Sequence, residues 1–337
     1  MSALRILILQ LKRIGDAILT APALASLRAA LPEARLHLVL SGAAAQLAPA
    51  FGMVDTVSLH RPVPGRGNAL TRILGRRFDV SLDFSGTDRT ALLALASRAS
   101  LRCGFEKDAK NWLRRRALNH RCSASVRDLH TIDRHHFLVE SALTALGCPV
   151  PPRVPDAGHL HLPPQAAERI LTKPAVVLHP GTAREEKYWS AAGWQKVIRH
   201  MRDVHGLPVI LTGSNDPAET AHLREIEQGA VIQENLAGRL SLPELAALLS
   251  RAALVLGVDS AAMHLAAAFA RPQVALFGPT NPFHWRPRHG NARVLLAGCP
   301  ENDSVQHFSP HMIQAPMTSL VPARVTSAID SLLLRVE

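Results

Sequence analysis

The feature of the chain that most constrains its fold is a series of short apolar segments, each followed by a stretch with helical spacing, and this series occurs twice. Such alternation is typical of βαβ units, in which parallel strands form a sheet covered by helices on both faces. In the first half we expect strands at 4–11, 36–40, 54–59 and 78–84, with a helix over 17–30. In the second half we expect strands at 175–178, 209–212, 254–256 and 273–277, and helices at 191–204, 218–228, 242–250 and from Ser260 onward.

A proline-dense stretch separates the two series, with prolines at positions 149, 151, 152, 155, 163 and 164. Neither a helix interior nor a central strand tolerates such a stretch. A length of 337 residues suits two domains, and a composition with only 4% aromatic residues suits helix-covered parallel sheets. We therefore predict an α/β protein with Rossmann-like domains at 1–160 and 161–337, the last helix being free to pack back on the first domain.

The charge balance predicts an anionic partner, since 38 Lys and Arg against 27 Asp and Glu give a formal charge of +11. One Tyr and nine Phe offer little surface for base stacking, so we predict no nucleic-acid partner. The four cysteines form no CxxC pair, and the apolar run at the N-terminus is too short to cross a bilayer. These features favour a cytoplasmic protein with reduced thiols.

The segment after the strand at 175–178 carries groups that suit a diphosphate. Gly181 leaves room for close backbone approach, Thr182 offers a hydroxyl and Lys187 a positive charge. Such a set can hold a pyrophosphate without a metal ion. The alternative is that residues 179–181 form only a tight turn and that Lys187 is solvated.

A second polar turn follows the strand at 254–256. Asp259 or Ser260 can cap the helix that begins there, and the free N–H groups of its first turn suit a phosphate. Ala261 continues the turn, and His264 lies on the same helix face as Ser260. A simple cap, and a histidine satisfied within the fold, are the alternatives.

Asp16 follows the first strand, in the segment Lys12-Arg13-Ile14-Gly15-Asp16. In open α/β sheets, ligands bind beyond the carboxyl ends of the strands, so a carboxylate at this point is placed to act as a general base. The alternative is that Asp16 is the N-cap of the helix expected from residue 17.

These motifs, with Phe277-Gly278-Pro279-Thr280-Asn281-Pro282 added, resemble glycosyltransferase family 9, the ADP-heptose:lipopolysaccharide heptosyltransferases. The resemblance covers nearly the whole chain, and the motifs occur in the family's order. It implies a GT-B fold, in which two Rossmann-like domains with parallel sheets face each other across a cleft. The C-terminal domain would then bind ADP-heptose, and the N-terminal domain the acceptor.

The resemblance also implies a role for each motif position. Thr182 and Lys187 would contact the phosphates, Lys187 also acting in catalysis by offsetting the charge of the departing ADP. Gly181 would lie against the donor, and Glu219 would bind its ribose. Asp259, Ser260 and Ala261 would form the turn beneath the sugar and pyrophosphate, with His264 beside them. The family often has glycine at the position of Ala261.

The reaction that follows is an inverting transfer of heptose from ADP-heptose to the lipopolysaccharide inner core, with Asp16 as general base. No second carboxylate suggests a covalent nucleophile, and no DxD motif is present, so we predict that no metal or other cofactor is required. The alternatives are another GT-B nucleotide-sugar enzyme with a different donor and a catalytically silent nucleotide-sugar binding protein.

The acceptor is expected to be the anionic lipopolysaccharide core, bound by basic groups of the first domain. The candidates are Lys12, Arg13, Arg61 and His130, the last in a segment whose three histidines we do not interpret as a metal site. The cluster Arg114-Arg115-Arg116 beside Trp112 suits anionic headgroups. We therefore expect a cytoplasmic protein that is peripheral on the inner membrane.

Overall fold

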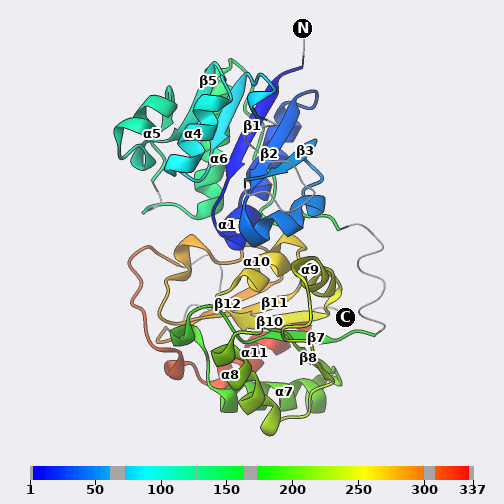
Figure 1. Cartoon of the computed structure of the whole chain (residues 1–337). Helices are drawn as coiled ribbons and strands as arrows, with labels where there is room; N and C mark the ends of the chain where they lie inside the picture. Colours follow the sequence, from blue (N-terminus) through cyan, green and yellow to red (C-terminus); the bar gives the residue numbers. More distant parts are fainter. Residues whose placement is uncertain (1–2, 61–72, 126, 163–172, 300–307, 334–337) are drawn as a thin grey trace. The chain divides into compact units, whose positions relative to one another are not determined.

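The computed structural model describes residues 3–60, 73–125, 127–162, 173–299 and 308–333, and these residues divide into two compact units, 1–161 and 162–337. Each unit contains one six-stranded parallel sheet with helices on both faces (Figure 1). The α/β fold with two parallel sheets is thus confirmed. Within the described ranges, no helix is both long and apolar enough to cross a bilayer.

The sheet of the first unit has the strand order β3-β2-β1-β4-β5-β6. Its strands are β1 (Arg5–Gln10), β2 (Arg35–Leu40), β3 (Thr56–Leu59), β4 (Val80–Asp83), β5 (Leu101–Phe105) and β6 (His120–Cys122). The helices are α1 (Ile14–Ile18), α2 (Ala21–Ala30), α4 (Asp88–Ala96), α5 (Trp112–Ala117) and α6 (Thr131–Ala145), with a 3-10 segment at Gly42–Ala50. Helices α2 and α6 pack together, and α4 packs with α5.

The second unit repeats this order with its own strands, as β12-β11-β10-β7-β8-β9. Its strands are β7 (Val176–His179), β8 (Val209–Leu211), β9 (Glu234–Asn235), β10 (Leu254–Val258), β11 (Gln273–Phe277) and β12 (Ala292–Leu296). The helices are α7 (Ala191–His205), α8 (Pro217–Gln228), α9 (Leu242–Arg251), α10 (Ala261–Ala268) and α11 (Pro322–Leu333). The last helix, α11, packs on α7, β11 and β12 of this unit.

The core of the second unit contains two tryptophans that contact each other. Trp189 and Trp194 are buried and meet edge to face with ring centroids 4.9 Å apart. Trp189 Nε1 donates to the carbonyl of Leu320, 2.9 Å away, in the segment that leads into α11. Aromatic side chains bury large apolar areas, and the Trp189 N–H has a partner, so Trp189 links the segment before α11 to the core beside α7.

The helix expected over 17–30 is broken into α1 and α2. Pro22 is the cause, because it has no N–H and its ring conflicts with the carbonyl four residues earlier, at Ile18. The Thr20 hydroxyl donates to the Asp16 carbonyl at 2.8 Å and so satisfies the end of α1. The prediction of one continuous helix was therefore wrong.

His135, on α6, is buried against the sheet of the first unit. Its Nδ1 lies 3.1 Å from the carbonyl of Leu19, and its ring meets Phe84 edge to face. Burial, reinforced by the positive charge of Arg134, lowers the pKa of His135 to about 3. In the unfolded chain the ring takes up a proton near pH 6.5, so the folded state loses stability as the pH falls from about 6.5 toward 3.

We expect His135→Leu to flatten this pH dependence. Between pH 4 and 6, the free energy of unfolding of the first unit should depend less steeply on pH in the variant, by about 1.4 kcal/mol per pH unit. Urea titrations over this pH range measure it, with His161→Leu, at an exposed histidine of the same unit, as the control. An unchanged slope in His135→Leu would show that this ring is protonated in the folded protein.

Candidate functional site

The two polar turns of the second unit lie at the point where its strand order reverses. The chain runs outward from β7 to β8 and β9, and then returns so that β10 pairs with the other side of β7. Gly257 permits this pairing, because a Cβ there would lie 2.5 Å from the backbone oxygen of His179. In doubly wound sheets, this reversal opens a crevice at the carboxyl ends of the strands.

An ion pair joins the two turns across this reversal. Lys187 Nζ lies 2.6 Å from Asp259 Oδ2, and the two side chains are only 13% and 11% exposed. The same carboxylate oxygen accepts a hydrogen bond from Thr280 Oγ1, 2.9 Å away, just after β11. Lys187 is therefore not a solvated surface lysine, and that alternative was wrong.

The start of α10 departs from a simple cap. Ser260 is the residue that precedes the helix, but its side chain makes no capping hydrogen bond. Its Oγ is buried and has no partner among the described residues, while the Asp259 carboxylate is taken by Lys187 and Thr280. Ala261 begins the helix, and His264 is buried within its next turn. No hydrogen bond within the described part of the fold therefore accounts for the Ser260 hydroxyl.

Glu219 projects from the first turn of α8 into a space left by two glycines. A Cβ on Gly181 would lie 2.1 Å from Glu219 Oε1, and one on Gly213 would lie 2.7 Å from the same atom. Glu219 Oε2 accepts a hydrogen bond from Ser214 Oγ at 2.5 Å. Oε1 is buried and has no partner among the described residues. A buried acceptor of this kind is unfavourable unless a donor reaches it.

His179 ends β7 beside this carboxylate. Burial holds the pKa of His179 below its ordinary value of 6.5, although the negative charge of Glu219 opposes the shift. Its Nδ1 lies 3.0 Å from Thr212 Oγ1. The neutral His179 ring and the Thr212 hydroxyl therefore form a hydrogen-bonded pair between the ends of β7 and β8.

Sequence reasoning missed three contributors to this arrangement: Thr212, Ser214 and Thr280. Thr212 directly follows β8, and Ser214 and Thr280 lie three residues beyond the ends of β8 and β11. Thr280 also lies inside the motif at 277–282, so closeness to a strand end was the available signal. Thr182, which sequence reasoning did select, is half-buried in the turn after β7.

In the first unit, Asp16 lies at the equivalent reversal, where β4 pairs with β1. The ends of these strands are tied by Ser85, whose Oγ accepts from the Leu11 N–H at 2.7 Å and donates to Gln10 Oε1 at 3.0 Å. Helix α1 begins at Ile14 with Arg13 as its N-cap, so the N-cap interpretation of Asp16 was wrong. Among the described residues, its half-buried carboxylate makes no side-chain hydrogen bond.

The four candidate acceptor residues differ in their surroundings. Lys12 is half-buried and Arg13 exposed, on the same turn as Asp16. Arg61 lies outside the described residues. His130 is buried and caps α6, its Nδ1 accepting from the Ile132 N–H at 3.2 Å. The structure thus brings Lys12, Arg13 and Asp16 together on one turn, whereas the His130 ring serves a helix end.

Two doubly wound sheets, each with polar side chains at its strand reversal, define a protein of the GT-B class. A solved structure described as "Structure of E. coli ADP-heptose lps heptosyltransferase II" shares this fold with a TM-score of 0.77 at 20% identity. The match covers 99% of this chain and 99% of that one.

The family model for "Glycosyltransferase family 9 (heptosyltransferase)" matches residues 68–310. The chain belongs to glycosyltransferase family 9.

Two curated relatives are heptosyltransferases. Lipopolysaccharide heptosyltransferase 3 of Escherichia coli is 35% identical over 165 residues, which is 47% of this chain and 46% of that protein. This match therefore spans less than half the length of that relative. Lipopolysaccharide heptosyltransferase 1 of Salmonella typhimurium strain LT2 is 26% identical over 295 residues, which is 83% of this chain and 90% of that protein.

We expect the close contact between Gly181 and Glu219 to give a measurable coupling energy between substitutions at these two positions. Gly181→Ala should destabilise the second unit by about 1–3 kcal/mol, since the new methyl group would displace the Glu219 carboxylate. In a Glu219→Ala background the same change should cost much less, because the carboxylate is gone. Chemical denaturation of the four proteins gives the coupling energy.

Gly290→Ala serves as the control, because a Cβ at Gly290 meets no atom within 4 Å. Equal costs of Gly181→Ala in both backgrounds would show that this glycine is needed for another reason.

Proposed function

We propose that this protein transfers a heptose from ADP-heptose to the inner core of lipopolysaccharide. The second unit would hold the nucleotide sugar and the first unit the acceptor. Family membership supports this, as do the names of the relatives. The observation that carries the proposal is the buried ion pair of Lys187 and Asp259 at the strand reversal, together with a buried Glu219 oxygen that has no partner among the described residues.

The donor phosphates would lie between Lys187 and the start of α10. Lys187 already has an anionic partner in Asp259, so a phosphate would share or replace an existing contact. The Ser260 hydroxyl lacks a partner among the described residues and can donate to such a ligand, and the helix dipole favours negative charge there. Ala261 and His264 would line the sugar side. As ADP departs, Lys187 would offset its growing charge.

The ribose would be bound by Glu219. A ribose offers two neighbouring hydroxyl donors, and Glu219 Oε1 is a buried acceptor with no donor among the described residues. Gly181 and Gly213 leave room around this carboxylate, and Thr182 adds a hydroxyl at the same strand end. Satisfying a buried acceptor contributes more than adding a bond to a solvated one.

Asp16 would act as the general base that accepts the proton of the acceptor hydroxyl. Its carboxylate has no side-chain hydrogen bond within the described part of the chain, so it is available for this role. Direct attack by the activated hydroxyl inverts the configuration at the anomeric carbon. We propose no metal in this step, because Lys187 and the α10 terminus would supply positive field at the leaving group.

The acceptor is proposed to be the anionic core of lipopolysaccharide, met by Lys12, Arg13, Arg61 and His130, with the protein peripheral on the cytoplasmic face of the inner membrane. Trp112, at the start of α5, is 77% exposed and suits an interfacial position. Arg114 of the same helix is bound to Asp88 at 2.7 Å, so Arg115 and Arg116 are the better candidates for headgroup contacts.

Calorimetric titration with ADP, UDP and GDP tests the donor. We expect ADP to bind most tightly and Lys187→Met to weaken ADP binding by about 10- to 100-fold, the size of one lost charge-assisted hydrogen bond. Lys196→Met, which removes an exposed lysine on α7, should leave the affinity unchanged. Tighter binding of UDP or GDP would instead favour an enzyme with a different donor.

Asp16→Asn tests the catalytic step. We expect turnover with ADP-heptose and a truncated lipopolysaccharide to fall by about 10²- to 10⁴-fold, with the affinity for ADP preserved. Glu33→Gln, at an exposed carboxylate of the same unit, is the matched control. Near-full turnover in Asp16→Asn would remove Asp16 as the base.

Two further readouts complete this experiment. The anomeric configuration of the product, determined by NMR, decides between inversion and retention. If the unaltered protein releases no ADP from ADP-heptose in the presence of acceptor, it is a silent binding protein.

A further inference from the structure

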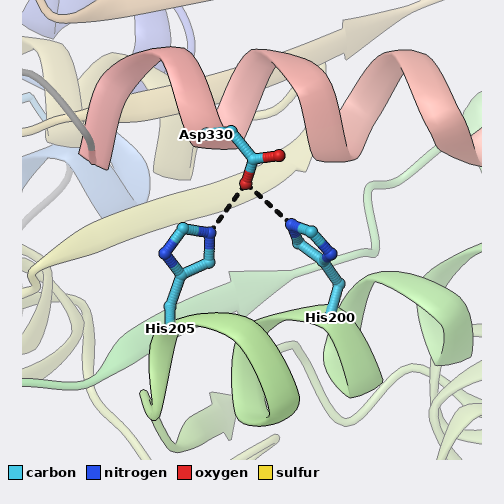
Figure 2. A group of neighbouring side chains, drawn as sticks. All are labelled: His200, His205 and Asp330. Atoms are coloured by element: carbon cyan, nitrogen blue, oxygen red, sulfur yellow. Dashed lines mark hydrogen bonds and ion pairs between the residues drawn. The ribbon is translucent and has the colours of Figure 1, made fainter.

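Two histidines and a carboxylate converge between helices α7 and α11, away from the strand-end turns. His200 Nε2 and His205 Nε2 each lie 2.7 Å from the same oxygen, Asp330 Oδ1 (Figure 2). The two rings meet edge to face with centroids 5.3 Å apart. Within the described residues, this is the only group of three His, Cys, Asp or Glu side chains that could share a metal ion.

The fold makes this convergence rigid. Helices α7 and α11 pack on the same side of the sheet, where Ile198, Met201 and Ile329 are buried in one core. His205 ends α7, and Gly206 then turns the chain in the left-handed conformation with φ +63°. The His205 ring lies beside that of His200, five positions earlier in the same helix.

The three side chains offer ligand atoms that divalent zinc prefers, imidazole nitrogen and carboxylate oxygen. All three ligand atoms lie within 4.8 Å of one another. A tetrahedral zinc ion with bonds of about 2.0–2.2 Å needs its ligand atoms roughly 3.3–3.5 Å apart. A bound ion would replace the two shared hydrogen bonds and would move each histidine nitrogen away from the carboxylate oxygen that now lies 2.7 Å from it.

The exposure of the group also suits a bound cation. The side chains of His200, His205 and Asp330 are 21%, 11% and 35% exposed, so water can supply a fourth ligand.

We propose that His200, His205 and Asp330 form a binding site for a divalent cation of the zinc class that joins α11 to α7. The site is structural. His205 lies at the end of α7 that leads into the start of β8, whereas the polar turns follow the carboxyl ends of the strands. The site therefore lies toward the opposite edge of the sheet, and the inference does not depend on the proposed function.

The test uses the full chain without an affinity tag, freed of metal by a chelator and titrated with zinc chloride alone. We expect one zinc ion per chain, bound with micromolar or tighter affinity. The melting temperature of the second unit should rise by roughly 5–10 °C when free zinc is about 100 times Kd.

Asp330→Asn separates the metal site from a plain hydrogen-bonded contact. The amide oxygen can still accept from both histidine rings, so the unfolding transition without metal should remain close to that of the unaltered protein. Zinc affinity should fall by at least about 100-fold, more than the roughly 10- to 100-fold that loss of an outer partner causes. The same loss is expected for His200→Gln and His205→Gln.

His161→Gln is the matched control, since it removes an exposed histidine of the other unit. It should leave zinc affinity and stoichiometry unchanged. Absence of saturable zinc binding by the unaltered protein, or equal affinity in Asp330→Asn, would overturn the proposal and leave these residues as a hydrogen-bonded link between two helices.

Discussion

Each unit depends on one strand pairing, between the strand that opens its series and the strand that returns beside it. In the first unit β4 pairs with β1, and in the second β10 pairs with β7, where Gly257 leaves no side chain to obstruct the contact. Because all strands are parallel, every strand end that precedes a helix lies at one edge. The positions of Asp16, Lys187 and Asp259 follow from these pairings, and so does their separation from the helix ends at the other edge.

The interior strands could be predicted from the sequence because continuous Val, Leu and Ile runs have few other structural uses in a chain of this composition. Strands β5, β6 and β12 could not, because each has an arginine as its second residue, which interrupts the apolar run. Their charges are accommodated by contacts distant in sequence: Arg102 Nε donates to the Ala117 carbonyl, and Arg293 Nε donates to Ser331 Oγ. The spacing of apolar residues along the chain does not reveal such partners.

The candidate site was predictable as a set of turns but not as a set of contacts. The order of strand, Gly or Pro and polar residue located the segments of Gly181 and Asp259, since strand ends are where such residues gather. That Lys187 pairs with Asp259, 72 residues later, depends on which strands are neighbours. Likewise, His200 and Asp330 are 130 residues apart, and only the packing of α11 on α7 brings them together.

The ion pair of Lys187 and Asp259 has a consequence for selectivity. A lysine with a resident carboxylate has little net attraction for simple anions, because inorganic phosphate would gain only the difference between its own contact and the one it replaces. In the proposed function, a ligand with hydroxyl groups that reach the Glu219 oxygen would gain further hydrogen bonds. The uncharged part of the ligand would then decide which nucleotide sugar binds. In the proposed reaction, Asp259 would pair again with Lys187 as the charged product leaves, and this pairing would ease product release.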